Sequence, residues 1–280
     1  MGVDHVLAFD CATKRALGDG DATAGSWKLV ELLKARARLE LVEGIARKEG
    51  RPAGDLSLTH VVITPDGPQQ QAESTDALRE RIEPLAGLGA ACEGCAANVS
   101  GDAFGCVGYL SYPVPRRSEQ WILDQLQPGD EFGGFVMLRA LDDFGYSGEP
   151  IDAMRARGLF ESEQALQRAI TDRHGTQRQV RSSQVLEALF AVGDALQPFH
   201  CALVLQWLGL LWIDGEPPRA LDDPRPLIKL QQAATTAERR ALTELALDSP
   251  GDDPALYELC GLMRALYAAF VLECSLLVSV

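Results

Sequence analysis

The segment ACEGCAANVSGDAFGC, at positions 91–106, holds three of the seven cysteines of the chain. Cys92 and Cys95 have the spacing of a zinc knuckle, in which one tight turn points two thiolates at the same ion, and Gly94 suits such a turn. Cys106 follows after ten intervening residues and supplies a third thiolate. The spacing therefore predicts a metal site, with zinc as the expected ion. An iron–sulfur cluster with one open iron is the alternative, because it also needs three thiolates.

The segment contains no fourth ligand, and the sequence leaves three candidates for it. Cys11 and His60 lie on predicted strands that we expect to share one sheet, and a water molecule is the third candidate. A protein ligand in this position gives a closed, structural site, whereas water gives an open, catalytic one. In the catalytic case Asp10, Glu93 or His60 is the expected acid or base.

Two further interpretations of the cysteines stay open. Cys92 and Cys95 can act as a reversible dithiol, although the carboxylate of Glu93 disfavours the thiolate that this chemistry needs. The cysteines can also be small buried side chains beside a turn, without any ligand. The sequence has neither the G-x-S-x-G motif nor the H-E-x-x-H motif, so no particular hydrolase chemistry is indicated.

The charge of the chain argues against nucleic acid as a partner. Its 280 residues carry a formal net charge of −14, which repels phosphate backbones and anionic lipid surfaces. Basic residues gather between Arg168 and Arg181, where Gly175 predicts a loop between two helices. We interpret this stretch as a solvated loop, with binding of an anion as the alternative.

The first residues bear on the compartment in which the protein works. They include the acidic Asp4 and only a very short apolar run, so we expect no secretion signal. We therefore expect a cytoplasmic protein in a reducing environment. An odd number of dispersed cysteines fits that environment better than a disulfide framework.

Two apolar stretches, 199–213 and 265–280, require a test for membrane insertion. Each is shorter than the about 20 residues that span a bilayer, and each has a polar interruption. His200 and Gln206 interrupt the first stretch, and Glu273 interrupts the second. We expect two buried core helices and no stable membrane span, with a membrane-active protein as the alternative.

Residues 1–116 show an alternation of strand and helix patterns. The predicted strands are 5–11, 56–65 and 106–114, and the predicted helices are 27–48 and 75–83. Because each helix can cover one face of the sheet, this order favours an α/β sandwich with a small mixed sheet.

The helix predicted at 27–48 has clear signals at both ends. Ser26 is the expected N-cap, and Gly50 with Pro52 ends the helix. Apolar residues recur every four positions along it and predict the face that packs on the sheet: Leu29, Leu33, Ala37, Leu41 and Ile45.

Residues 117–280 are predicted to form a mainly helical bundle. Helices are expected at 118–126, 162–170 and 183–197, with one strand at 134–141. Thr235 and Glu238 form a predicted capping box. Asp253, followed by a proline, begins the last helix. Together the two parts predict an α+β protein with domains at 1–116 and 117–280.

These patterns favour a cytoplasmic zinc protein whose helical part presents a surface to a protein partner. The first alternative is a metalloenzyme with an open coordination position at Cys92, Cys95 and Cys106. The second is a membrane-active protein that uses 199–213 and 265–280. The reaction and the small-molecule substrate, if there is one, are not indicated by any motif in the sequence.

Overall fold

The computed structural model describes residues 2–64, 67–190, 195–218 and 225–280. The chain divides into two compact units: unit 1 is Met1–Phe9 with Ala96–Val280, and unit 2 is Asp10–Cys95. Helices account for 52% and strands for 18%, and the strands form several small antiparallel sheets. The predicted α+β class is therefore confirmed. The domain division at residues 116 and 117 stays a prediction.

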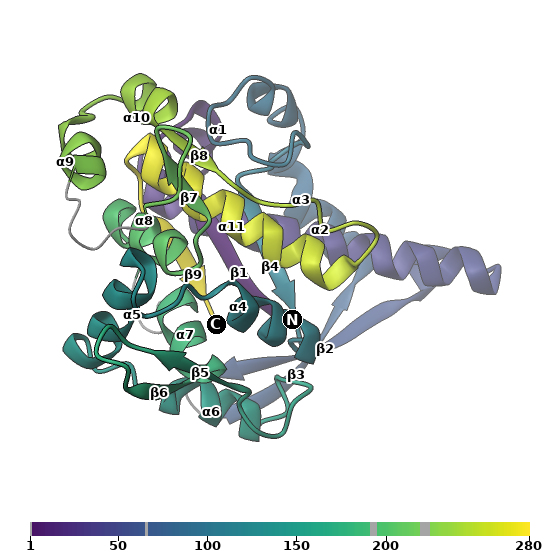
Figure 1. Ribbon diagram of the computed structural model, residues 1–280. Coiled ribbons are helices and arrows are strands. Elements are labelled where there is room, and N and C mark those ends of the chain that lie inside the picture. Colours follow the sequence, from purple (N-terminus) through teal and green to yellow (C-terminus); the bar gives the residue numbers. More distant parts are fainter. Residues whose placement is uncertain (1, 65–66, 191–194, 219–224) are drawn as a thin grey trace. The chain divides into compact units, whose positions relative to one another are not determined.

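Unit 2 is built from three helices, a hairpin and short 3-10 turns (Figure 1). In chain order its elements are α1 (Ala12–Leu17), α2 (Ala22–Glu49), η1 (Ala53–Asp55), β2 (Ser57–Thr64), β3 (Gly67–Ser74), α3 (Thr75–Ile82), η2 (Glu83–Leu85) and η3 (Gly89–Cys92). Helix α1 packs against the start of α2 at Gly25, where an added Cβ would lie 1.9 Å from the carbonyl oxygen of Lys14. This close approach is possible because glycine has no side chain.

Helix α2 begins earlier than the sequence predicts. Its N-cap is Asp21, whose carboxylate accepts hydrogen bonds from the amides of Thr23 and Ala24, whereas Ser26 lies inside the helix. The predicted cap at Ser26 is therefore wrong, because an aspartate one turn earlier already satisfies the free amides. Gly50 ends the helix in a left-handed conformation with φ 64°, as predicted.

The buried face of α2 also differs from the predicted one. Leu32, Ala35 and Leu39 are buried, and the last two pack with Leu78 of α3. Leu41 is 55% exposed and Ile45 is 38% exposed. A strict spacing of four residues drifts around a helix of 3.6 residues per turn, so the predicted stripe leaves the buried side near its end.

Unit 1 contains most of the chain and the larger core. In chain order its elements are β1 (Gly2–Leu7), β4 (Val107–Ser111), α4 (Arg116–Gln125), α5 (Phe132–Asp143), α6 (Glu149–Ala156), β5 (Gln167–Thr171), β6 (Gln177–Arg181), α7 (Ser182–Phe190), α8 (Pro198–Trp207), β7 (Leu211–Ile213), α9 (Arg225–Gln232), α10 (Thr236–Leu242), β8 (Thr243–Leu245), α11 (Pro254–Leu272) and β9 (Leu276–Ser279).

The largest sheet has the strand order β4-β1-β9, with β1 paired antiparallel to both neighbours (Figure 1). It joins the start, the middle and the end of the chain. The predicted mixed sheet is wrong, because β2 pairs with β3 in a separate hairpin. Strands β2 and β3 are consecutive in the chain, and such neighbours pair locally more easily than distant strands do.

The core of unit 1 lies where α11 packs on α8 and on the strands β1 and β4. Val3, Val6 and Leu7 of β1 are fully buried, as are Leu262 and Leu266 of α11. Strand β1 is buried on both faces, so its polar residues Asp4 and His5 are buried together with its apolar ones.

The two apolar stretches do not form the continuous helices that the sequence predicts. Residues 199–213 comprise most of α8, a turn at Gly209 with φ 66°, and strand β7. Residues 265–280 comprise the end of α11, a left-handed turn at Glu273, and strand β9. Among the helices that the structure describes, α11 alone passes the length and composition test for a membrane span, and 61% of its apolar window is buried.

Two short segments have the opposite structure to the predicted one. Residues 134–141, predicted as a strand, lie inside helix α5. Residues 162–170, predicted as a helix, end in strand β5, which pairs with β6 across a turn at Gly175. A short apolar run is compatible with either state, and tertiary packing decides between them. The helix predicted at 183–197 is α7, which ends at Phe190, and 191–194 lie outside the described residues.

Other signals at helix ends are confirmed. Thr235 and Glu238 form the predicted capping box of α10, with both reciprocal hydrogen bonds. Asp253 accepts from the amides of Ala255 and Leu256 at the start of α11. The predicted mainly helical bundle, however, also holds the strand pairs β5–β6 and β7–β8.

Candidate functional site

The turn between Cys92 and Cys95 has the geometry that the sequence predicts. The amide of Cys95 donates to the carbonyl of Cys92 at 3.2 Å, and Gly94 has φ 73°. Only glycine adopts this left-handed conformation at no steric cost. Cys92 is buried and Cys95 is half-buried. Both cysteines belong to unit 2.

Cys11 is placed differently from its prediction. It is the N-cap of α1, with φ −136° and ψ 164°, and strand β1 ends four residues earlier at Leu7. In the first turn of α1, the hydroxyl of Thr13 lies 3.7 Å from the sulfur of Cys92. Unit 2 therefore brings the start of α1 against the 3-10 turn that carries Cys92.

The other predicted ligands lie elsewhere. Cys106 belongs to unit 1, where its carbonyl accepts from the amide of Leu7 at 3.1 Å. His60 is on β2, and its side chain lies outside what the structure describes. The prediction that Cys11 and His60 share a sheet is wrong. Among the described residues, no three His, Cys, Asp or Glu side chains are grouped so as to hold a metal ion.

Two of the acid–base candidates, Asp10 and Glu93, are solvent-facing groups. The guanidinium of Arg15 donates to both carboxylate oxygens of Asp10 and holds the pKa of that carboxyl below its usual value. Glu93 is exposed at the end of η3. A carboxylate paired in this way stays ionised, so Asp10 is a poor general acid.

A buried ionic network joins α4, α6 and α7. Arg155 donates to both carboxylate oxygens of Glu119, at 3.0 and 2.7 Å, and to the carbonyl of Ser162 at 2.8 Å. Ser182 donates to the same carboxylate at 2.7 Å. Arg155 is 6% exposed and Glu119 is 0% exposed. Each charge has its counter-charge, so this network holds the helices in place and is no reactive centre.

An aromatic surface lies where the end of α5 meets α8. We call it the aromatic patch; its rings in contact are Phe144, Tyr146, His200 and Trp207, and we include Phe199 as the residue next to His200 on α8. Phe144 is 65% exposed and Phe199 is 52% exposed. The ring of Phe144 stacks on His200 at a centroid distance of 6.5 Å, and Tyr146 contacts Phe144, His200 and Trp207.

The inner members of the patch anchor the outer ones. Tyr146 Oη lies 3.4 Å from His200 Nε2, and Trp207 is almost fully buried. Burial lowers the pKa of His200, and burial together with the charge of Glu187 raises the pKa of Tyr146. At neutral pH both rings are therefore uncharged. The patch is an apolar surface that two well-packed rings hold rigid.

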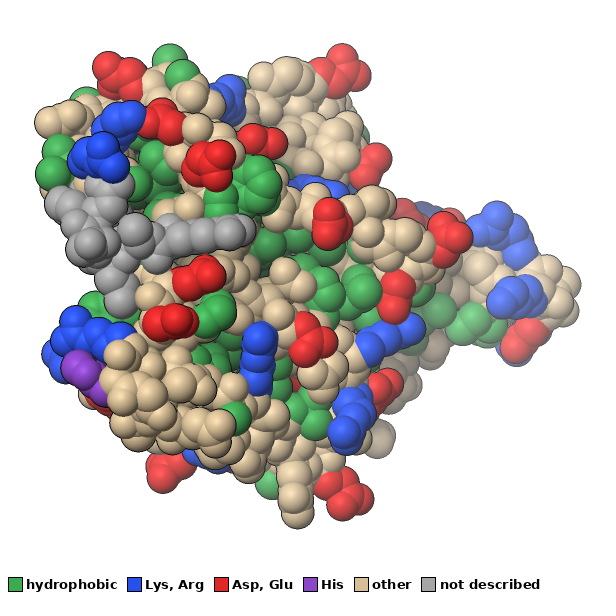
Figure 2. Space-filling model, viewed as in Figure 1, with side chains coloured by type: hydrophobic (Ala, Val, Ile, Leu, Met, Phe, Trp, Pro, Cys, Tyr) green, Lys and Arg blue, Asp and Glu red, His purple; other side chains and the backbone are tan. Residues whose placement is uncertain are grey.

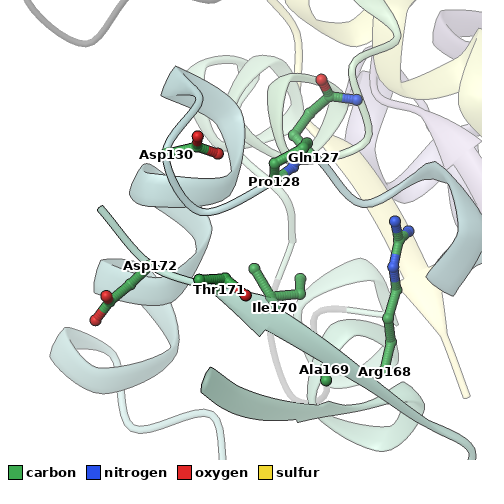
Figure 3. A pocket seen from close by; sticks show the side chains of 8 residues that line it. All are labelled: Gln127, Pro128, Asp130, Arg168, Ala169, Ile170, Thr171 and Asp172. Atoms are coloured by element: carbon green, nitrogen blue, oxygen red, sulfur yellow. The ribbon is translucent and has the colours of Figure 1, made fainter. Parts of the chain in front are cut away.

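A small pocket opens beside strand β5. It has a volume of about 210 Å³ and is lined by Gln127, Pro128, Asp130, Arg168, Ala169, Ile170, Thr171 and Asp172 (Figure 3). Arg168 lies at one side of it, and Asp130 and Asp172 lie at the other. The amides of His174 and Thr176 donate to Asp172 and keep the pKa of its carboxyl below the usual value.

The basic stretch that the sequence singles out is mostly paired. Arg178 binds Asp142 with two hydrogen bonds, at 2.8 and 2.7 Å, and Arg181 pairs with Asp152 at 2.8 Å. Arg168 instead lines the pocket and donates to the carbonyl of Leu123. The predicted loop between helices is wrong, because this stretch forms the β5–β6 hairpin.

Neither the patch nor the pocket is visible in the sequence as a motif. The one available signal is local: Phe144 and Tyr146 flank Gly145 in a turn, and large aromatic residues are unusual there. The exposure of Phe199 at the start of an otherwise apolar helix gives no signal, because composition does not show which face is covered.

No protein-family model matches the chain, and neither the curated proteins nor the solved structures that were compared with it give a match.

Proposed function

We propose that this protein is an interaction module that binds a protein partner through the aromatic patch. The observation that carries the proposal is the exposure of Phe144, whose ring stacks on His200, together with the exposure of Phe199, the residue before His200 on α8. Aromatic side chains that are held rigid are the residues that most often dominate binding energy, because they bury a large area at little cost in side-chain entropy.

The exposed fractions of Phe144 and Phe199 determine how much binding energy each ring can contribute. Two phenylalanine rings that are more than half exposed still have much apolar surface to bury, and each contributes about 1 to 2 kcal/mol when a partner covers it. A single exposed apolar residue needs no explanation, but Phe144 belongs to a cluster of rings with Tyr146, His200 and Trp207. The patch is thus suited to serve as the centre of an interface whose rim is polar.

The charge of the chain indicates the kind of partner. At −14, a second copy of the chain would be repelled at long range. On the face shown in Figure 2, basic side chains lie among acidic ones instead of forming a separate field. A partner segment with Arg or Lys beside apolar residues is attracted by the negative net charge. It also gains binding energy from cation–π contacts with the exposed rings.

Selection from a random peptide display library tests this function. The library is selected on the folded protein and counter-selected on a Phe144→Ala/Phe199→Ala variant. We expect enriched peptides to combine Arg or Lys with apolar residues. Their binding to the double variant should be at least about tenfold weaker, which corresponds to about 1.4 kcal/mol.

The control is Tyr257→Ala, which removes a 56% exposed aromatic ring from α11, outside the patch. This variant should bind the selected peptides as the unmodified protein does. Equal loss in both variants, or acidic peptides alone, would contradict the proposal. Self-association that Phe144→Ala/Phe199→Ala abolishes would instead identify a second copy as the occupant.

The turn at Cys92 and Cys95 favours zinc binding as a second candidate function. Its hydrogen bond and its left-handed Gly94 are those of a turn that presents two sulfurs on one side. Within unit 2, the start of α1 is the nearest source of a further thiolate, from Cys11. An ion held by Cys92 and Cys95 would be structural, and a ligand from Cys11 would require the start of α1 to move toward the turn.

Elemental analysis of the purified protein tests the zinc site. We expect about one zinc per chain, with loss of the metal and a lower melting temperature in Cys95→Ser. Cys274→Ser, which lies in unit 1, should keep the metal. A metal-free protein that melts cooperatively, with no change in Cys95→Ser, removes this candidate.

A further inference from the structure

Strand β5 has one edge without a strand partner in the described part of the chain. It pairs only with β6, in an antiparallel register that places Ile170 opposite Arg178. At the ends of the ladder, Asp172 donates to the carbonyl of Thr176 and Ser182 donates to that of Leu166. Hydrogen-bonded pairs alternate along an antiparallel ladder, so Ala169 and Thr171 turn their main-chain groups to the open edge.

The pocket lies along this open edge. Ala169 and Thr171 form part of its lining, and the opposite wall is the segment from Gln127 to Asp130. Gly129 forms an isolated bridge with Asp172, which closes one end of the edge. Gly129 lies against the carbonyl oxygen of Thr171, so the main-chain groups that face an extended ligand are those of Ala169 and the amide of Thr171.

The charges of the pocket are separated along the strand. Arg168 lies near the start of β5, whereas Asp172 follows its last residue and Asp130 lies on the same side as Asp172 (Figure 3). One guanidinium N–H of Arg168 is used by the carbonyl of Leu123, and a guanidinium has five N–H groups. The pocket thus has a donor for a carboxylate at one end and, at the other, the carboxylate of Asp130 as an acceptor for an ammonium group, since the amides of Thr176 and His174 already bind Asp172.

The volume limits the size of the ligand. A space of about 210 Å³ is below the range of about 300 to 1,000 Å³ that is typical of pockets for drug-sized compounds, so the pocket suits a smaller ligand. Extended residues advance by about 3.4 Å, so a peptide of two or three residues spans the length from Ala169 to Asp172.

We propose that this pocket binds a short peptide with free ends, in extended form and antiparallel to β5. Its carboxylate binds Arg168, its ammonium group lies beside Asp130, and its backbone pairs with Ala169 and with the amide of Thr171. The site is separate from the aromatic patch, so it goes beyond the proposed interaction function and stands on different residues.

Nuclear magnetic resonance titration with Ala-Ala tests this site in the full chain. We expect saturable shifts of the Ala169 and Thr171 amides. Binding of Ala-Ala should be at least about tenfold tighter than binding of acetyl-Ala-Ala, which lacks the ammonium group, and of Ala-Ala-amide, which lacks the carboxylate. The blocked peptides keep the same backbone, so they isolate the contribution of each charge.

Variants at Asp130 and Arg168 assign the charges to residues, with a control at Glu163. Asp130→Asn should weaken the binding of Ala-Ala but leave the binding of acetyl-Ala-Ala unchanged. Glu163→Gln, at an exposed position, should change the binding of neither peptide. Arg168→Lys keeps the positive charge near the Leu123 carbonyl and should retain part of the affinity for Ala-Ala. Arg168→Gln should bind Ala-Ala no more tightly than it binds Ala-Ala-amide.

Equal affinity for all three peptides, or no saturable shift up to about 10 mM, overturns the site. Its failure is distinguishable from failure of the proposed interaction function, because Phe144→Ala/Phe199→Ala should bind Ala-Ala as well as the unmodified protein does.

Discussion

At the scale of single residues, His5 and Arg155 are buried titratable or charged groups whose roles are structural and not catalytic. His5 lies on the central strand β1, opposite Gly108 of β4, and is 3% exposed. Its ring occupies the space above Gly108, where an added Cβ would lie 2.5 Å from His5 Nε2. Burial lowers the pKa of His5 to about 4, so the imidazole is neutral at pH 7.

The lowered pKa of His5 predicts a loss of stability in mild acid. Below the ordinary pKa of about 6.5, the unfolded chain takes up a proton that folded His5 does not accept. Between pH 7 and pH 5.5 this lowers the free energy of unfolding by about 1 kcal/mol. Urea denaturation at both pH values should show this loss, and His5→Gln should show a smaller one. The same pH dependence in His5→Gln would assign the effect to other groups.

The Arg155–Glu119 pair predicts a large effect of a single substitution. Arg155→Met leaves the carboxylate of Glu119 buried without its counter-charge and should lower the free energy of unfolding by about 3 to 5 kcal/mol. Adding Glu119→Gln should restore part of that loss, because the remaining amide is neutral. Denaturant titration of both variants measures the free energy of unfolding. A double variant less stable than Arg155→Met would contradict the explanation.

At the scale of elements, the sequence predicts local features better than pairing. The capping box at Thr235 and the cap at Asp253 depend on neighbours within four residues, and both are present. The strand predicted at 134–141 is part of α5, since an apolar run of this length carries no information about its distant partners. Ser26 failed as a cap because Asp21 competes for the same role nearby.

The cap of α11 gives a test at this scale. Asp253→Ala removes the acceptor for the amides of Ala255 and Leu256 and should cost about 1 kcal/mol of stability. Asp253→Asn keeps an oxygen in the same place and should cost less, although it loses the ion pair with Arg117 at 2.9 Å. Thermal melting of both variants compares them. Equal melting temperatures would show that the charge, not the cap, matters here.

At the scale of the whole molecule, two features escape prediction for one physical reason. The sheet β4-β1-β9 joins segments from three parts of the chain, and the aromatic patch joins the end of α5 to α8. Periodicity in a sequence shows that a face is apolar but not which segment covers it. The turn at Cys92 was predictable because it is local, whereas convergence of thiolates from Cys92, Cys95 and Cys106 depends on contacts that no spacing encodes.

Fluorescence polarisation of a display-selected peptide tests most directly whether Phe144 and Phe199 form a partner-binding surface. We predict that Phe144→Ala/Phe199→Ala binds at least about tenfold more weakly and melts at the same temperature as the unmodified protein, since both rings are mostly exposed. Tyr257→Ala should leave binding unchanged. Undiminished binding by the double variant would contradict the account, and so would a weakening that accompanies a general loss of folding.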